Sequence, residues 1–348
     1  MLDFMKEKLS SWEKIAESGK EVVIYGTGNG ADKVIDEFCR LGIKIMGVTA
    51  SDDFVRGQNF RGFTVKKLCE FDGDFIIAPA FASCIPEVME RIYSLEKNYR
   101  VIVPVVPVYG EEIFARDFLG RNESALYEAY SLFEEDSKRI FAACVDFMFG
   151  GELSVLKSIT TPKDEAFTGF FRPRQNEDFL DLGAYRGDTV DELLKYSDGS
   201  YSSITALEPD EKTFRKLKEH IGGMRDVSLL QKAVSDRDGA VLFSGAAGRQ
   251  SCIAEKGKLT ECVTVDTLGE ERTFTYIKMD VEGGEAAALR GAEKTLKRDK
   301  PRLNIALYHR SEDIFSLPLL VKKINPEYKF CIRRHPYIPC WDMNMYCI

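Results

Sequence analysis

Residues 179–189 read FLDLGAYRGDT, and this stretch decides the fold of the C-terminal half of the chain. An apolar strand leads to Asp181 and Gly183, and a tight turn continues through Gly187 into a helix. Glycine allows backbone conformations and close approaches that a Cβ atom would block. The pattern predicts a strand, a glycine turn and a helix, as in α/β domains that bind a nucleotide-like ligand at this turn.

A second predicted strand, residues 203–209, ends in an acidic residue, Glu208. A carboxylate at the tip of the second strand can accept hydrogen bonds from both ribose hydroxyls. Together with the glycine turn, it indicates a ligand that contains adenosine. These features alone do not separate NAD from S-adenosylmethionine (SAM). For SAM, which has no phosphates, the loop amides can meet the methionine carboxylate, and Asp181 can take the ammonium group.

A third acidic feature, IKMDVEGGE at residues 277–285, places Asp280 and Glu282 at the carboxyl end of a central strand. The next strand ends in His309 at the same edge, which lines the ligand crevice in open α/β sheets. An unperturbed imidazole can accept a hydroxyl proton at neutral pH. His309, Glu282 and Asp280 are therefore the candidate catalytic residues. A helix-start acidic cluster and a structural histidine are the alternative explanations.

The order of the expected elements predicts an α/β protein in three parts. Residues 1–108 form a small Rossmann-like α/β domain. Residues 109–165 contain no convincing strand and form a helical connector. Residues 166–348 alternate strands and helices again. The strands expected in the first part are 22–28, 44–50, 74–80 and 101–106, with helices at 30–41 and 86–95.

In the third part, the chain ends with two strands at residues 328–335 and 343–348. Only a short loop separates them, so they should pair antiparallel. A parallel sheet that closes with an antiparallel hairpin is the layout of a class I methyltransferase. The preceding elements are strands at 179–184, 203–209, 227–234, 275–281 and 302–309 and helices at 187–196, 210–221, 284–297 and 312–324.

Residues 166–348 resemble the FkbM family of SAM-dependent methyltransferases. The resemblance rests on FLDLGAYRGDT, ALEPD (206–210), KAVSD (232–236), VTVDTLG (263–269), IKMDVEGGEAAALRGA (277–292) and YHRSEDIFSLP (308–318). It implies a class I methyltransferase fold, SAM as methyl donor and O-methylation of sugars or small natural products. The family often has Gly-Ala-Glu where Gly283, Gly284 and Glu285 stand. The expected SAM contacts are Asp181, Gly183, Ala184, Tyr185, Gly187, Asp188, Thr189, Glu208, Pro209, Val234, Ser235 and Asp280.

The N-terminal part has its own glycine turn, YGTGNGA at residues 25–31, between a strand and a helix. It is not a clean dinucleotide fingerprint, because the third glycine comes early. The part resembles the small Rossmann-like domains found ahead of sugar-modifying enzymes, which can bind a nucleotide-sugar. Gly26, Gly28, Gly30 and Asp52 are the candidates for that role. The alternative is a scaffold whose glycines only permit close strand–helix packing.

Composition narrows the classes of ligand and location. The net charge is −8 and no stretch is strongly basic, which argues against a nucleic-acid substrate. Three histidines without ligand spacing and nine cysteines without Cys-x-x-Cys pairs predict no metal site. The charged N-terminus is no signal peptide, and no run reaches the ~18 apolar residues of a membrane span, so a cytoplasmic protein is expected.

Three functions follow as hypotheses. The first is SAM-dependent O-methylation of a sugar, a nucleotide-sugar or another small molecule, by direct in-line methyl transfer. The second is an NAD(P)-dependent oxidoreductase or epimerase that uses the N-terminal glycine turn. The third is a non-catalytic nucleotide-binding protein. The sequence leaves the acceptor open, and it is compatible with a homodimer.

Overall fold

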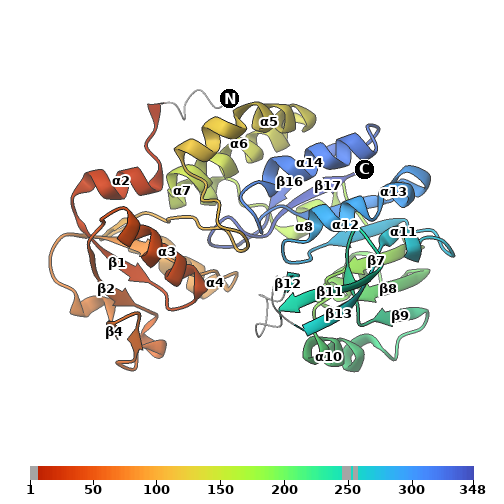
Figure 1. Cartoon of the computed structure of the whole chain (residues 1–348), viewed down its shortest axis with the longest axis horizontal. Helices are drawn as coiled ribbons and strands as arrows, with labels where there is room; N and C mark the ends of the chain where they lie inside the picture. Colours follow the sequence, from red (N-terminus) through yellow and green to blue (C-terminus); the bar gives the residue numbers. More distant parts are fainter. Residues whose placement is uncertain (1–6, 245–251, 254–257) are drawn as a thin grey trace. The chain divides into compact units, whose positions relative to one another are not determined.

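The chain divides into two compact units (Figure 1). The computed structural model describes residues 7–244, 252–253 and 258–348. The first unit comprises Met1–Tyr130, Lys138–Thr160 and Arg334–Asp342, and the second comprises Ser131–Ser137, Thr161–Arg333 and Met343–Ile348. Residues 109–165 are divided between these two units. The domain boundaries at 108 and 165 stay predictions.

The first unit is built on a six-stranded sheet in the order β3-β4-β2-β1-β5-β6. Neighbouring strands run parallel, except that β3 and β4 form an antiparallel hairpin. The strands are β1 (Glu21–Tyr25), β2 (Ile45–Thr49), β3 (Asn59–Phe60), β4 (Phe63–Lys66), β5 (Phe75–Pro79) and β6 (Arg100–Val101). The expected strand at 101–106 is thus shorter, and the sequence pattern did not predict the hairpin.

Helix α3 (Asn29–Arg40) packs on this sheet through one apolar stripe. Val34, Ile35 and Phe38 are buried on the helix and share a core with Val22 and Ile24 of β1. Their spacing of three and four residues is that of one helix face, which is why this segment is helical. The other helices that begin in this unit are α2 (Ser11–Ser18), η1 (Asp52–Phe54), η2 (Leu68–Glu70), α4 (Pro86–Leu95), α5 (Arg116–Leu132) and α7 (Leu153–Ser158).

The second unit has a seven-stranded sheet in the order β16-β17-β15-β14-β7-β8-β9. The central strands are parallel, and β17 lies antiparallel to β15. Lys329 and Ile348 exchange both backbone hydrogen bonds, as predicted for a terminal hairpin. The strands are β7 (Asp178–Leu182), β8 (Ser203–Leu207), β9 (Val227–Leu230), β14 (Tyr276–Met279), β15 (Arg302–Ala306), β16 (Phe330–Arg334) and β17 (Met343–Cys347). The predicted fold class is confirmed.

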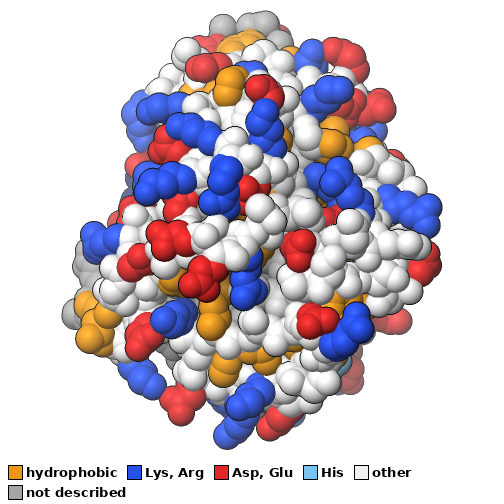
Figure 2. Space-filling view, turned by 90° about the vertical axis from the view of Figure 1, so that its right-hand side faces the viewer, with side chains coloured by type: hydrophobic (Ala, Val, Ile, Leu, Met, Phe, Trp, Pro, Cys, Tyr) orange, Lys and Arg blue, Asp and Glu red, His pale blue; other side chains and the backbone are white. Residues whose placement is uncertain are grey.

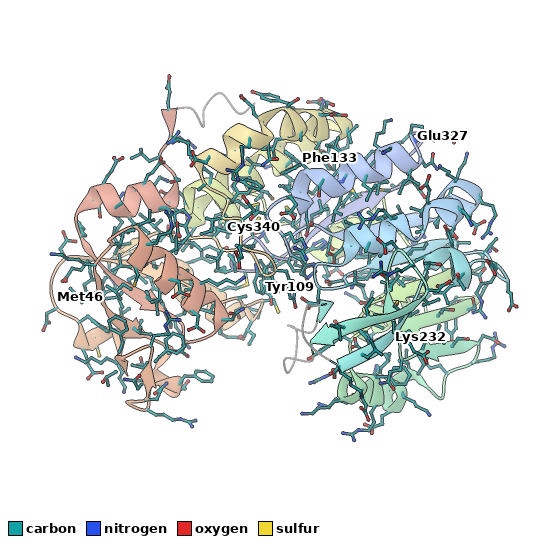
Figure 3. All side chains as sticks on the ribbon, in the orientation of Figure 1. Met46, Tyr109, Phe133, Lys232, Glu327 and Cys340 are labelled. Atoms are coloured by element: carbon teal, nitrogen blue, oxygen red, sulfur yellow. The ribbon has the colours of Figure 1, made fainter. Side chains whose placement is uncertain are left out.

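Beyond β9 the chain leaves the large sheet, so the strand predicted at 227–234 was wrong as one element. After Lys232 (labelled in Figure 3) it joins a separate four-stranded sheet in the order β10-β13-β11-β12. This small sheet consists of β10 (Ala233–Val234), β11 (Gly239–Ser244), β12 (Cys252–Ile253) and β13 (Lys258–Val263). Lys232 pairs with Glu261 of β13 at 3.0 Å, which helps to tie this turn to the small sheet.

The helix expected at 284–297 is also two elements, α12 (Glu285–Arg290) and α13 (Glu293–Asp299). A Cβ at Gly291, between them, would lie 2.1 Å from the carbonyl oxygen of Ser235. The glycine therefore lets the helix junction meet the chain after β10. The remaining helices are α6 (Glu135–Gly150), α8 (Lys163–Thr168), α9 (Asp188–Tyr196), α10 (Glu211–Ile221), α11 (Val265–Leu268) and α14 (Asp313–Ile324). None of the helices in the described ranges has the length and apolar composition of a membrane span.

Candidate functional site

The glycine loop after β7 is shaped by close contact with β14. Gly183 has a φ of +80°, and a Cβ there would lie 1.9 Å from the carbonyl oxygen of Asp280. The amides of Gly183 and Ala184 both donate to the carbonyl oxygen of Leu207, at 3.1 and 2.9 Å. Gly187 is also left-handed, at φ +94°, and caps the start of α9. The first glycine is thus required by packing against protein backbone, and the amides at 183 and 184 already have acceptors.

Asp181 is a buried carboxylate at the end of β7. Its exposed fraction is 0%, and neither carboxyl oxygen has a hydrogen-bond partner among the described residues. Burial raises the pKa of Asp181 to about 7, although nearby Lys278 acts in the opposite direction. A buried carboxyl group without partners is costly. Its position matches a site that is completed by a cationic or hydrogen-bonding ligand.

Glu208 follows β8 and links the tips of the two strands. Its Oε2 accepts from the amide of Tyr185 at 3.1 Å, and its Oε1 accepts from the amide of Asp210 at 2.9 Å. Burial raises the pKa of Glu208 to about 7, partly offset by these two backbone bonds. Pro209 lies between the carboxylate and the N-cap of α10, Asp210. The predicted ribose acceptor is therefore positioned against the glycine loop.

The other predicted SAM contacts fall on two further segments. Val234 and Ser235 lie at the end of β10, and Ser235 is buried with its amide bonded to the carbonyl oxygen of Val263 at 3.1 Å. Asp188 and Thr189 form the first turn of α9. The sequence placed the first pair at the end of a strand in the large sheet, whereas the structure places it in the small one.

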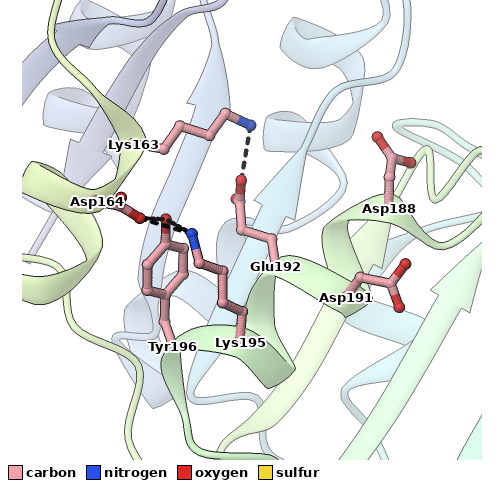
Figure 4. A pocket seen from close by; sticks show the side chains of 7 residues that line it. All are labelled: Lys163, Asp164, Asp188, Asp191, Glu192, Lys195 and Tyr196. Atoms are coloured by element: carbon pink, nitrogen blue, oxygen red, sulfur yellow. Dashed lines mark hydrogen bonds and ion pairs between the residues drawn. The ribbon is translucent and has the colours of Figure 1, made fainter.

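Asp188 also lines a hollow of about 400 Å³ beside α8 and α9 (Figure 4). The charged side chains that line it mostly pair with one another. Lys163 pairs with Glu192 at 2.8 Å, Lys195 pairs with Asp164 at 2.7 Å, and the hydroxyl of Tyr196 donates to Asp164. Ligand pockets are mostly apolar with few polar groups, so this hollow does not suit an adenine ring.

Four titratable side chains meet at the ends of β14 and β15, and we name them the His309 cluster: Asp280, Glu282, Glu285 and His309. Nε2 of His309 lies 3.3 Å from Oδ1 of Asp280 and 3.4 Å from Oε2 of Glu282. Nδ1 lies 3.0 Å from Oε1 of Glu285. The structure thus joins the three candidate catalytic residues and adds Glu285, which sequence reasoning missed.

Local backbone geometry presents these side chains. Glu282 has a left-handed φ of +54°, and Gly283 follows at +87°. Glu285 starts α12, and its Oε1 accepts from the amide of Val281 at 2.8 Å, which closes the loop. A left-handed residue other than glycine costs of order 1 kcal/mol and recurs at functional sites. An acid at the start of a helix, four residues after Val281, is the signal that could have revealed Glu285.

The imidazole is not the unperturbed group that the sequence analysis assumed. His309 is fully buried. Burial alone would lower the pKa of His309, but Glu285, Glu282 and Asp280 outweigh it and raise that pKa well above its ordinary value. Asp280 also accepts from the hydroxyl of Tyr308 at 3.2 Å. Both ring nitrogens face carboxylates inside the protein, so this imidazole is not the freely accessible one that the sequence analysis assumed.

The N-terminal glycine turn contacts the end of β5. A Cβ at Gly30 would lie 2.8 Å from the carbonyl oxygen of Ala80, and one at Gly26 would lie 3.2 Å from the same atom. Around Gly28, no atom lies within 4 Å of such a Cβ. Asp52 is exposed in η1 after β2. Packing therefore accounts for two of the three glycines, and a nucleotide site here stays a prediction.

Two solved structures resemble this chain to different degrees. The methyltransferase FkbM from Methylobacillus flagellatus KT matches over 96% of this chain and 92% of its own, with a TM-score of 0.73 and 18% identity, which shows a shared fold. Fibrillarin from Aeropyrum pernix, solved with natively bound S-adenosyl-L-methionine, covers 50% of this chain and 67% of its own. Its TM-score of 0.33 and identity of 14% are too low to support an argument.

No curated protein matches this sequence. The family model of the methyltransferase FkbM domain matches residues 181–329, from the buried Asp181 to the start of the terminal hairpin. This range contains Glu208, Ser235 and the whole His309 cluster. Residues 181–329, within the second unit, therefore match the methyltransferase FkbM domain.

Proposed function

We propose that this chain is a SAM-dependent O-methyltransferase that acts on a hydroxyl group of a sugar or another small molecule. The observation that carries the proposal is Asp181, whose buried carboxylate has no partner among the described residues. It lies at the carboxyl end of β7, beside the loop that Glu208 holds. In an open α/β sheet this edge is where ligands bind.

The residues of this edge fit the parts of SAM. Asp181 accepts the ammonium group of the methionine moiety. Glu208 accepts the ribose hydroxyls with the lone pairs that Tyr185 and Asp210 leave open, since each carboxylate oxygen can accept more than one bond. The amides of the first turn of α9, at Asp188 and Thr189, suit the methionine carboxylate. When bound, SAM supplies a methyl group that is already electrophilic.

The exposed fractions of the side chains in the His309 cluster indicate which of them can contact the acceptor. The side chains of Asp280 and Glu282 are 28% and 24% exposed, whereas that of His309 is 1% exposed. The two carboxylates can therefore reach an acceptor, accept the hydrogen bond of its hydroxyl and hold its oxygen in line with the methyl group. Such alignment is worth several kcal/mol of the barrier. The buried His309 contacts both carboxylates on their protein side and so positions them.

The charge pattern of one face of the molecule argues against a nucleic-acid acceptor. On the face drawn in Figure 2, acidic and basic side chains are interspersed, without a broad basic area for a phosphate backbone. Carboxylates orient hydroxyl groups, which abound in sugars. These observations support a hydroxylated small molecule as the acceptor.

The test has a binding arm and a turnover arm. Calorimetric titration with S-adenosylhomocysteine (SAH) should give micromolar binding to the intact protein. Asp181→Asn should weaken it at least tenfold, because an amide leaves the ammonium group without a counter-charge. If the intact protein binds neither SAM nor SAH, the proposal fails. Tight SAM binding without transfer of a radiolabelled methyl group to any of a panel of sugars and nucleotide-sugars would favour a non-catalytic binding protein.

A further inference from the structure

The His309 cluster has the arrangement of a metal site as well as of a substrate-orienting one. Asp280, Glu285 and His309 each offer a ligand atom, and these atoms lie within 4.8 Å of one another. Glu282 is not part of that group, but its Oε2 lies 3.4 Å from Nε2 of His309. The residues come from the ends of two neighbouring strands, β14 and β15, and from the start of α12.

The distances around Nε2 of His309 agree with shared coordination. Bonds of about 2.1 Å to one cation put neighbouring ligand atoms roughly 3.0–3.4 Å apart in octahedral or tetrahedral geometry. Nε2 lies 3.3 Å from Oδ1 of Asp280 and 3.4 Å from Oε2 of Glu282. Charge-assisted hydrogen bonds are shorter, at about 2.7–2.9 Å. Each of these two separations from Nε2 therefore suits neighbouring ligands of one cation better than a direct ion pair.

Glu285 occupies the place of an outer partner. A metal-bound histidine usually donates its second ring N–H to a carboxylate, which fixes the ring. Oε1 of Glu285 lies 3.0 Å from Nδ1 of His309. Glu285 is 1% exposed, and its Oε2 has no hydrogen-bond partner among the described residues. This buried carboxylate is an independent sign that the cluster is built to hold more positive charge than it contains.

The charges of the side chains around His309 also favour a bound cation. The carboxylates of Asp280, Glu282 and Glu285 all lie within 3.4 Å of one imidazole. Lys278 supplies one further cation, with its Nζ 3.3 Å from Oδ2 of Asp280. Buried like charges need compensation. A divalent cation between Asp280, Glu282 and His309 would neutralise them.

We propose that Asp280, Glu282 and Nε2 of His309 bind a divalent transition-metal cation, with Glu285 orienting the imidazole. One nitrogen and two carboxylate ligands suit Mn²⁺, Fe²⁺ or Zn²⁺, whereas Mg²⁺ and Ca²⁺ prefer oxygen alone. Three protein ligands leave coordination positions open. If the proposed function also holds, an acceptor hydroxyl takes one of these positions and is acidified there. Spacing along the chain could not show the site, because its ligands come from two strands.

The test measures binding of Mn²⁺ to the full chain by the loss of the electron paramagnetic resonance signal of the free ion. We expect one site per chain, which Glu282→Gln weakens at least tenfold and His309→Gln abolishes. Glu282 is half-buried, so its variant should fold even if the buried His309 variant does not; circular dichroism checks both. The matched control is Asp191→Asn, which removes a carboxylate 3.0 Å from Nε2 of the exposed His220 and should leave binding unchanged.

The outcomes separate this site from the proposed function. No binding of Mn²⁺, or binding that Glu282→Gln leaves unchanged, would overturn the metal site. SAH binding is measured in parallel on the same samples. SAH binding without Mn²⁺ binding removes the metal site and leaves the methyltransferase proposal standing. Mn²⁺ binding without binding of SAM or SAH supports the metal site and removes that proposal.

Discussion

Glu208 at the tip of β8 accepts a hydrogen bond from the backbone amide of Tyr185, with 3.1 Å between Oε2 and N. Tyr185 lies in the glycine loop after β7 and has a left-handed φ of +48°. One carboxylate therefore fixes the loop and also faces the edge where an adenosine ligand would bind. Ligand affinity and loop geometry are coupled through the same side chain.

This coupling predicts a graded response to changes at Glu208. Glu208→Ala removes the acceptors for Tyr185 and Asp210 and the ribose contact, so SAH affinity should fall at least tenfold and the melting temperature should drop. Glu208→Gln keeps one carbonyl oxygen, so its SAH affinity and melting temperature should lie between those of the parent protein and Glu208→Ala. Glu211→Ala, at an exposed site paired with Lys258, is the control. Calorimetry and thermal unfolding measure both effects, and equal affinity in all four proteins would contradict the ribose role.

Asp181 predicts a pH dependence of stability. Burial raises its pKa to about 7 from an ordinary 3.8, so the folded protein holds a proton that the unfolded chain has already released. Stability from this group is full below pH ~4 and is lost as the pH rises to about 7. The loss amounts to a few kcal/mol at most.

Asp181→Asn removes this titration and serves as the test. The difference in unfolding free energy between the variant and the parent should move in favour of the variant from pH 5 to pH 8. Taking the difference cancels the contributions of other groups that both proteins share. Denaturant titrations at five pH values measure it. A difference that stays constant over this range would mean that Asp181 is ionised in the folded protein.

The sequence predicted the sheet well because the strands carry local signals. FLDLG, ALEP and IKMD each combine an apolar run with an acidic or glycine end, and these became β7, β8 and β14. The departure after β9 could not be predicted in this way. Leu230 and Ala233 belong to one predicted strand, VSLLQKAV at residues 227–234. The pairing of β10 with the distant β13 is what separates them.

In the candidate site, too, local sequence patterns could not reveal contacts between residues that are distant in the chain. Asp280, Glu282 and His309 were found because each ends a strand. The raised pKa of His309 could not be predicted, because it depends on Glu285. Glu285 starts a helix, and a sequence pattern explains an acid there by the helix dipole. The reason for Gly183 was also hidden. Its neighbour is the carbonyl oxygen of Asp280, which follows another strand, β14, and no local pattern contains that contact.

Gly183 predicts a contrast with a glycine of similar backbone conformation. Gly199 has a φ of +76° with nothing within 4 Å of its Cβ position, whereas Gly183 has a φ of +80° and a Cβ position 1.9 Å from Asp280 O. Gly199→Ala should cost about 1–2 kcal/mol for the left-handed conformation alone. Gly183→Ala should cost more than about 3 kcal/mol and displace the loop. Thermal unfolding and SAH titration of both variants measure the contrast.

The N-terminal glycine turn gives a prediction that decides between a nucleotide site and a scaffold. A Cβ at Gly30 meets the carbonyl oxygen of Ala80 at 2.8 Å, and one at Gly28 meets nothing within 4 Å. If the glycines serve packing, Gly30→Ala lowers the melting temperature and Gly28→Ala does not. NADH fluorescence then shows no saturable binding to the intact protein.

A nucleotide that lies against this turn would reverse the ranking of the two variants. The open space at Gly28 would then be the place where backbone and ligand meet, so Gly28→Ala would weaken NADH or a nucleotide-sugar with little change in stability. Because the two glycines lie two residues apart at the start of the same helix, they share its dipole and solvent environment. A difference between them therefore reports on what each Cβ would touch. Saturable NADH binding that is lost in Gly28→Ala would establish a dinucleotide site in this unit, which the oxidoreductase hypothesis requires.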